Sequence, residues 1–266
     1  MSEQQLVIVE KRGDVDWITL NRPEKLNTFN EELVDDLVNY FRSLADDHSV
    51  RIVVLKANGR AFCAGLDFSA DAFAANERTP NIVLQLQKKI AEIYRAMRRA
   101  PQPIIALVHG AACGGGFSLA LAADIRIAGE SAKMNAAYIT IGLTGCDMGS
   151  SYFLPRLVGT SVASELLLTG RFIEAPRALA VNLVSEVVPD DQLDQAAQSY
   201  VDDMLKTSPL GLRLTKDGIN LGVDANSLDA AMAVEDRQQT LLSLTEDARE
   251  AAAAFFAKRA PQFEDR

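Results

Sequence analysis

The sequence predicts an α/β protein in which a mixed body of strands and helices precedes a helical carboxy-terminal region. Short β-rich or apolar runs alternate with amphipathic stretches up to about residue 190, after which strand-like runs disappear. The length of 266 residues suits one large domain or a domain with an appendage, and 48% hydrophobic residues can bury a full core. We therefore expect a core over residues 1–195 and a helical region over residues 196–266.

The expected strands are short runs rich in apolar or β-branched residues, at 17–20, 52–55, 104–108 and 125–128. Residues 17–20 end at Asn21-Arg22-Pro23, where proline interrupts a strand ladder. Residues 52–55 and 104–108 are wholly apolar, which is typical of strands covered on both faces.

The expected helices follow from apolar spacing and from Gly and Pro boundaries. Thr28-Phe29-Asn30-Glu31 matches a capping box with Thr28 as the N-cap, and an apolar stripe follows at helical spacing in Leu33, Leu37, Phe41 and Leu44. Residues 82–99 form a helix that stops before Pro101, and Gly114-Gly115-Gly116 opens an Ala/Leu-rich helix to about Ala123. The carboxy-terminal helices are expected at 191–206, 209–221, 226–242 and 246–259.

Composition excludes several classes of function. The net charge of −9 disfavours binding to nucleic acid or to anionic membranes, which both need clustered Lys and Arg. The two His and three Cys show no metal-ligand spacing, so we expect no metal. No apolar run approaches the roughly 20 residues of a membrane helix. An odd number of Cys and an amino terminus unlike a secretion signal lead us to expect a soluble, cytoplasmic protein.

The glycine-rich segment from His109 to Ser118 is the most informative part of the chain. Three consecutive Gly, at 114–116, lie between a buried strand and a helix start, where free backbone N–H groups and the helix dipole favour an anion or a developing oxyanion. A tight turn with close helix packing explains the glycines equally well. A second small-residue segment, 60–67, follows another buried strand, so the two loops together could supply two N–H donors.

These two segments and four others resemble the enoyl-CoA hydratase/isomerase family, the crotonase superfamily. The matching motifs, in order, are Leu20-Asn21-Arg22-Pro23-Glu24-Lys25-Leu26-Asn27, Ala61-Phe62-Cys63-Ala64-Gly65-Leu66-Asp67, the triple glycine, Leu154-Pro155-Arg156-Leu157-Val158-Gly159, Glu165-Leu166-Leu167-Leu168-Thr169-Gly170-Arg171 and Phe255-Phe256-Ala257-Lys258-Arg259. The resemblance implies a crotonase spiral of repeated ββα units, with carboxy-terminal helices that pack between subunits. It also implies a homo-oligomer, either a trimer or a dimer of trimers. The motifs specify the fold better than the reaction, because the superfamily carries many reactions.

The resemblance also assigns residues to the binding of an acyl-CoA thioester. The N–H groups of Leu66 and Gly115 would form an oxyanion hole that stabilises a thioester enolate. The substrate and CoA-binding residues it implies, together with the residues facing the pocket, are Lys25, Leu26, Ala64, Leu66, Asp67, Phe68, Gly115, Ser118, Tyr138, Phe255 and Lys258. Among these, Asp67 is expected to fix its loop, and Phe255 and Lys258 match positions that reach a neighbouring subunit's CoA. A solvated lysine at a helix end is the alternative for Lys258. No separate cofactor is implied, since CoA arrives with the substrate.

The chain departs from the family at the two hydratase glutamates. One of these positions holds Ser118, and the other, twenty residues later, holds Tyr138. Hydration needs one group to activate water and another to protonate Cα, and neither hydroxyl suits that work at its ordinary pKa. The two-Glu hydratase mechanism is therefore not expected.

One carboxylate remains in this neighbourhood. Asp147 aligns, after one inserted residue, with an Asp that some family isomerases use, and a single carboxylate suffices for a 1,3-proton shift. Its alternative role is to cap a helix that begins near Gly149. A Ser118–His109–Asp124 triad lacks the G-x-S-x-G elbow and is disfavoured.

The sequence thus leads us to expect double-bond isomerisation of an enoyl-CoA, with Asp147 as acid and base. Two alternatives stay open: a hydratase or lyase that uses other groups, such as Tyr138 or Asp147, and a non-catalytic acyl-CoA binder. Residues 69–80, which should cover the acyl end, contain no motif that defines the acyl chain.

Overall fold

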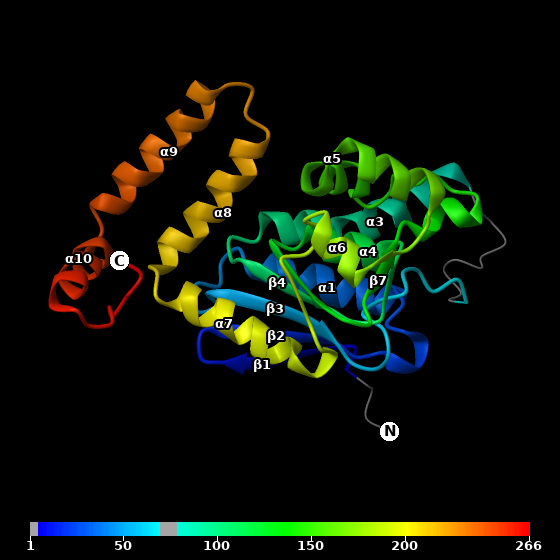
Figure 1. The fold of residues 1–266 in the computed structure, drawn as a ribbon, viewed down its shortest axis with the longest axis horizontal. Helices are drawn as coiled ribbons and strands as arrows, with labels where there is room; N and C mark the ends of the chain where they lie inside the picture. Colours follow the sequence, from blue (N-terminus) through cyan, green and yellow to red (C-terminus); the bar gives the residue numbers. More distant parts are fainter. Residues whose placement is uncertain (1–4, 70–78) are drawn as a thin grey trace.

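The computed structural model describes residues 5–69 and 79–266, so most of the segment expected to cover the acyl end lies outside the described residues. The strands of the described residues form two sheets (Figure 1). The larger sheet has the order β1-β2-β3-β4-β6-β9, and the smaller has the order β5-β7-β8. Their bounds are β1 Val7–Arg12, β2 Val15–Leu20, β3 Ile52–Ala57, β4 Ile104–Val108, β5 Ala111–Cys113, β6 Ile125–Gly129, β7 Lys133–Asn135, β8 Ile173–Glu174 and β9 Glu186–Val188.

All four expected strands are present, as β2, β3, β4 and β6. From β2 onward the neighbours in the larger sheet are parallel, and β1 pairs with β2 in antiparallel orientation. The side chains of β4 are all buried, as its apolar sequence predicts for a strand covered on both faces. The strands not expected from the sequence are the edge strand β1 and the short strands β5, β7, β8 and β9.

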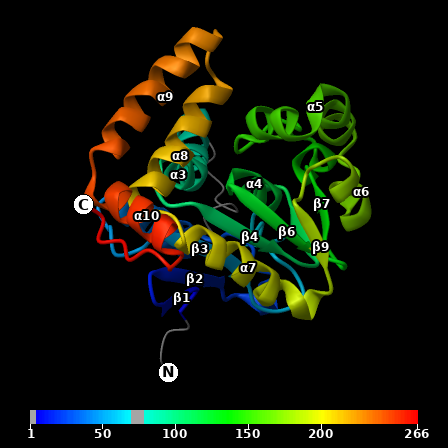
Figure 2. The same cartoon turned by 60° about the vertical axis from the view of Figure 1, so that its left-hand side comes forward.

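The helices cover both faces of the larger sheet (Figures 1 and 2). Their bounds are α1 Glu31–Ser43, α3 Pro80–Arg99, α4 Gly115–Ala122, α5 Ser150–Thr169, α6 Ala175–Ala180, α7 Leu193–Leu205, α8 Pro209–Val223, α9 Leu228–Ser243 and α10 Glu246–Ala257, with 3-10 turns η1 Pro23–Lys25, η2 Ala137–Ile141 and η3 Asp190–Gln192. The main core lies between the sheet and α1, α3 and α4, and a second core lies beneath α7.

The start of α1 corrects one expectation. Asn30, not Thr28, is the N-cap, because its side-chain oxygen accepts the Leu33 N–H at 3.0 Å. The Thr28 hydroxyl instead donates to the Lys25 carbonyl at 2.8 Å, within the preceding turn. The apolar stripe of the helix is confirmed, since Leu33, Leu37, Phe41 and Leu44 are all buried.

Helices α8, α9 and α10 form an arm, the carboxy-terminal arm, beside the sheet-containing body. The hairpin of α8 and α9 projects from the body in both views (Figures 1 and 2). Helix α10 lies at the end of the molecule away from α4 (Figure 1). The expected boundary at residue 195 falls inside α7, whose residues Leu193, Ala197 and Val201 pack into the second core. None of the helices in the described part of the chain is long and apolar enough to cross a membrane.

Candidate active site

Two loops that follow neighbouring strands lie side by side at one edge of the larger sheet. Because β3 and β4 are parallel, their carboxyl ends meet there, and the loops after them are joined by backbone bridges. The Phe62 N–H donates to the His109 carbonyl at 2.9 Å, and the Cys63 N–H donates to Ala111 at 3.1 Å. The two small-residue segments expected from the sequence are thus brought together.

Glycine is required at this junction by close approach of the two backbones. Gly65 has a φ of +94°, and a Cβ there would lie 2.8 Å from the Cys113 oxygen and 3.5 Å from the Gly115 nitrogen. A Cβ on Gly116 would lie only 2.0 Å from the Cys63 oxygen. The packing explanation of the glycines is therefore confirmed, and this same packing carries the Gly115 nitrogen close to the loop of Leu66.

The backbone N–H groups of Leu66 and Gly115 have no hydrogen-bond acceptor among residues 5–69 and 79–266. Phe29 bonds the peptides on both sides of Leu66, accepting from Asp67 at 3.0 Å and donating to Gly65 at 2.8 Å, so the Leu66 N–H points away from Phe29. Gly115 is the first residue of α4, where an N–H has no partner within the helix. Two free N–H donors on adjacent loops are the kind of group from which an oxyanion hole is built.

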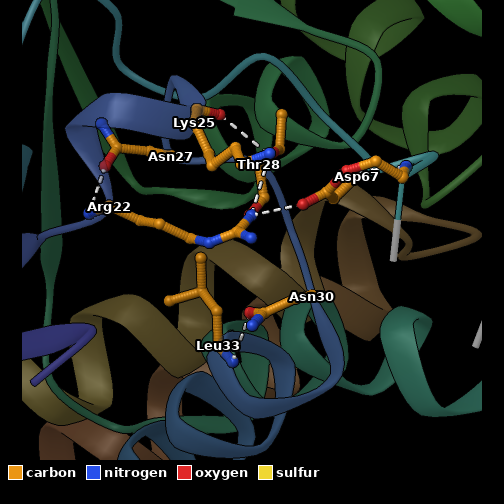
Figure 3. A network of polar contacts seen from close by, with 8 residues as sticks. Arg22, Lys25, Asn27, Thr28, Asn30, Leu33 and Asp67 are labelled. Atoms are coloured by element: carbon orange, nitrogen blue, oxygen red, sulfur yellow. Dashed lines mark hydrogen bonds and ion pairs between the residues drawn. The ribbon is translucent and has the colours of Figure 1, made fainter. Parts of the chain in front are cut away.

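Asp67 holds the first loop in place, as expected. One of its carboxylate oxygens accepts from the Ser69 N–H at 2.9 Å and from the Ser69 hydroxyl, and the other accepts from the Arg22 guanidinium at 2.7 Å. Figure 3 shows Arg22 reaching from the Lys25 turn toward Asp67. These bonds, from Ser69 first and then from Arg22, lower the pKa of Asp67 to about 2. The carboxylate is occupied by the loop and is not placed for acid–base chemistry.

The residues expected along CoA lie at the rim of the same junction. The Ala64 N–H donates to the Leu26 carbonyl at 3.0 Å, which joins the Lys25–Leu26 turn to the oxyanion loop. Leu26 adopts a left-handed backbone with a φ of 53°, and Lys25 is exposed. Phe68 is also exposed. The structure thus places the Lys25–Leu26 turn beside the loop that carries Ala64 and Leu66.

Ser118 and Tyr138, which the resemblance aligns with the two hydratase glutamates, bond to each other. Their hydroxyl oxygens are 2.8 Å apart in a buried pair, and each also approaches the Asp147 carbonyl oxygen, at 3.3 and 3.4 Å. Burial raises the pKa of Tyr138, so this phenol stays neutral.

The disfavoured triad is absent from the structure. The His109 ring nitrogen lies 2.8 Å from the Gly59 carbonyl oxygen, and Asp124 pairs with Arg98 and Lys216. Ser118 therefore has neither of the triad partners that the sequence offered.

Asp147 lies next to the hydroxyl pair and is half-buried. Its carboxylate does not cap α5: the Ser150 N–H donates to the Asp147 backbone carbonyl at 2.9 Å, and the N-cap Gly149 has no side chain. One carboxylate oxygen, Oδ1, accepts from the Met148 N–H at 2.8 Å and from the Gln87 side-chain amide. Desolvation by burial raises the pKa of Asp147 above its ordinary value, against these two hydrogen bonds. A carboxylate with a raised pKa in a half-buried site is suited to accept and return a proton.

Gln87 is the site residue that the sequence did not reveal. It lies on α3, half-buried, and its partner Asp147 is sixty residues away in the chain. The one pattern in the sequence that could have pointed to Gln87 is its spacing from Tyr94, seven residues later on the same helix face. That spacing does not by itself indicate a chemical role.

Phe255 and Lys258 lie away from this site. They belong to the end of α10 and the residue after it, at the far end of the molecule from α4 (Figure 1). Phe255 is 78% exposed, and Lys258 is also exposed. Their expected role toward a neighbouring subunit stays a prediction. The described residues contain no group of three or more His, Cys, Asp or Glu side chains placed to hold a metal ion.

Solved structures define the class of this fold. The crystal structure of an enoyl-CoA hydratase from Bacillus anthracis matches with a TM-score of 0.92 and 31% identity, covering 98% of this chain and 100% of that one. The protein therefore has the crotonase fold, as the resemblance implied.

The sequence model of the enoyl-CoA hydratase/isomerase family matches residues 10–266, and the chain belongs to that family. A Mycobacterium tuberculosis protein named "Probable enoyl-CoA hydratase EchA12" is 41% identical over 99% of this chain and 94% of its own length. The 1,2-epoxyphenylacetyl-CoA isomerase of Escherichia coli is 35% identical over 99% of both chains. Relatives thus include proteins named as hydratases and one named as an isomerase.

Proposed function

We propose that the protein is an enzyme that shifts the double bond of an enoyl-CoA by a 1,3-proton transfer. The N–H groups of Leu66 and Gly115 bind the thioester oxygen, and Asp147 removes a proton from the α-carbon of a β,γ-enoyl thioester. The electron pair spreads over the dienolate and the thioester oxygen, where the two N–H donors stabilise it. Asp147 then returns the proton to the γ-carbon, which yields the α,β-enoyl thioester.

The observation that carries this proposal is the distribution of acid–base groups around the oxyanion donors. The two positions of the hydratase glutamates hold Ser118 and Tyr138, whose hydroxyls are engaged with each other. Asp147 is the carboxylate beside them, and burial raises its pKa. One carboxylate that gives back the proton it took is sufficient for isomerisation, whereas hydration needs a second group to activate water. The reaction transfers no electrons to or from the substrate, so it needs no redox cofactor.

The relative named 1,2-epoxyphenylacetyl-CoA isomerase is consistent with this choice, and those named hydratases favour the alternative of water addition. A panel of β,γ- and α,β-enoyl-CoAs of several chain lengths distinguishes isomerisation from hydration. The reactions are followed by the absorbance of the conjugated thioester and by the mass of the product. Isomerisation leaves the mass unchanged, whereas hydration adds one water.

The variant Asp147→Asn tests the mechanism, with Asp203→Asn as its control. Asp203 is an exposed residue of α7 that pairs only with Lys206 among the described residues. Asp147→Asn should abolish isomerisation while acyl-CoA binding, measured by calorimetry, persists. Normal turnover by this variant contradicts the mechanism. If the wild type binds acyl-CoA but neither shifts a double bond nor adds water, the protein is a non-catalytic binder.

We also propose that the protein forms a homo-oligomer, a trimer or a dimer of trimers, through its carboxy-terminal arm. Helix α9 has no buried residue, and large apolar side chains at the arm's surface include Leu228, Leu244, Phe255 and Phe256. An apolar surface of this kind on separate helices is typical of an interface. Sedimentation-equilibrium mass tests this proposal, and a monomer at micromolar concentration would overturn it.

A further inference from the structure

Asp147 has two carboxylate oxygens in unequal surroundings. Oδ1 accepts from the Met148 N–H at 2.8 Å and from the Gln87 amide. Oδ2 accepts no hydrogen bond from residues 5–69 or 79–266. It is also absent from the buried side-chain oxygens that lack a partner, so it is accessible from outside the protein. The structure thus marks Oδ1 as the held atom and Oδ2 as the atom free to exchange a proton.

The helix that carries Gln87 also contacts the start of α4. Tyr94 is buried on α3, and its hydroxyl donates to the Gly115 carbonyl at 3.0 Å. Gln87 and Tyr94 are seven residues apart, so they lie on one face of α3, two turns or roughly 10 Å from each other. One rigid helix therefore contacts both the acid–base carboxylate and the residue that supplies an oxyanion donor.

We propose that Gln87 is a positioning residue that holds Oδ1 of Asp147 and so directs Oδ2 toward the substrate carbons. This inference rests on the proposed isomerase function. A carboxamide suits the task because it donates an N–H to the carboxylate and has no charge at any working pH. Its spacing from Tyr94 sets the distance between the proton carrier and the oxyanion hole.

The charged and titratable groups around Asp147 do not compete with this role. Tyr94 on α3 and Tyr138 on η2 both have a pKa raised by burial, and burial raises the pKa of Cys63 in the oxyanion loop to about 12. These groups stay neutral in the range where a carboxylate titrates. The preceding residue, Cys146, is exposed. The Gln87 amide and the Met148 N–H are the donors that favour the charged form of Asp147.

The variant Gln87→Leu removes the donor, and Gln85→Leu is the matched control at an exposed position of the same helix. Loss of a hydrogen bond to a carboxylate should raise its pKa, so the acidic limb of the kcat/KM profile should move up by about one pH unit. The value of kcat should fall about tenfold as the carboxylate loses its orientation, with KM within about twofold of wild type. Gln85→Leu should behave as wild type.

A second variant, Gln87→Glu, keeps the size of the side chain and places a like charge beside Asp147. It should move the acidic limb further up than Gln87→Leu does, because two adjacent carboxyl groups resist joint ionisation. The role of Gln87 is overturned if both Gln87 variants keep the kcat of the wild type and an unmoved acidic limb of the kcat/KM profile. If Asp147→Asn is inactive in the same assays, the proposed function still stands. Full isomerase activity in Asp147→Asn, or none in the wild type, overturns the proposed function instead.

Discussion

The hydroxyl oxygens of Ser118 and Tyr138 lie 2.8 Å apart, and both approach the carbonyl oxygen of Asp147. The two buried hydroxyls therefore form a neutral pair that contacts the segment carrying the Asp147 carboxylate. This pair holds the backbone at Asp147 in place. The proposed acid–base residue and its support are thus linked.

Removing the phenol hydroxyl should weaken this support. Tyr138→Phe leaves the buried Ser118 hydroxyl without its nearest partner, so we expect a loss of about 1 kcal/mol in the free energy of unfolding. The control Tyr152→Phe removes a surface hydroxyl that bonds to Asp224 and should change stability by less than about 0.5 kcal/mol. Urea unfolding measures both, and equal effects in the two variants would contradict the buried hydroxyl pair.

The pH dependence of catalysis should reflect the raised pKa of Asp147. Its base form is required, so kcat/KM should fall as the pH drops through that pKa, and the acidic limb should lie above 3.8, the ordinary value for an aspartic acid. Isomerisation of a β,γ-enoyl-CoA measured between pH 4 and 8 tests this. A limb at or below 3.8 is incompatible with a desolvated Asp147 as the base.

The pKa of Asp67 is lowered, in contrast to that of Asp147, and it predicts a pH dependence of the free energy of unfolding. Its folded-state pKa is lowered from 3.8 to about 2, so its contribution is present above pH 3.8 and is lost as the pH falls through 2. Asp67→Asn should cost about 1–2 kcal/mol at pH 7, and the difference from wild type should shrink between pH 4 and 2. Urea unfolding at several pH values checks this, and a difference that is independent of pH would show that Asp67 stabilises without its charge.

Close packing of the two loops predicts a large effect at Gly116. Alanine there would place a Cβ 2.0 Å from the Cys63 carbonyl oxygen, so the helix must shift and we expect a loss of about 3 kcal/mol. The control Gly222→Ala meets no atom within 4 Å and lies in helix α8, so it should be neutral or stabilise by up to about 1 kcal/mol. Thermal unfolding compares the two, and a Gly116→Ala protein as stable as wild type would refute the close approach.

The parts of the fold that the sequence predicted are those set by local pattern. The stripe of Leu33, Leu37 and Phe41 predicted α1 because burial of one helix face depends on spacing alone. The N-cap was misplaced because Thr28 and Asn30 are both good caps, and the preceding turn, where Thr28 bonds to Lys25, decides between them. The strands of two or three residues in the smaller sheet are too short to show a period.

The candidate site was predicted where residues matched family motifs, and it was missed where its geometry depends on folding. The loops of Leu66 and Gly115 were expected together, and the structure places them so. Gln87 was not expected, because a glutamine on a helix has no distinguishing pattern and its partner Asp147 lies sixty residues away. Only the packing of α3 against the site reveals this pair.

The match of Phe255 and Lys258 to family positions that reach a neighbouring subunit's CoA predicts that one subunit completes the site of another. Phe255 and Lys258 lie at the end of α10, which is far from α4 in the same subunit (Figure 1). A lysine near the CoA phosphates would act locally despite a net charge of −9. Lys258→Gln should raise KM for an acyl-CoA about tenfold but leave KM for the corresponding acyl-pantetheine unchanged. The control Lys206→Gln, at another exposed lysine that pairs with Asp203, should change neither value.

Mixed oligomers of Asp147→Asn and Lys258→Gln subunits sharpen this test. A Lys258→Gln subunit retains Asp147, and an adjacent Asp147→Asn subunit supplies Lys258, so some sites regain both groups and turn over with the KM of the wild type. If Lys258 instead served its own subunit's site, every active site in the mixture would keep the raised KM. If Lys258 is a solvated helix-end residue, the Lys258→Gln protein alone already has the KM of the wild type.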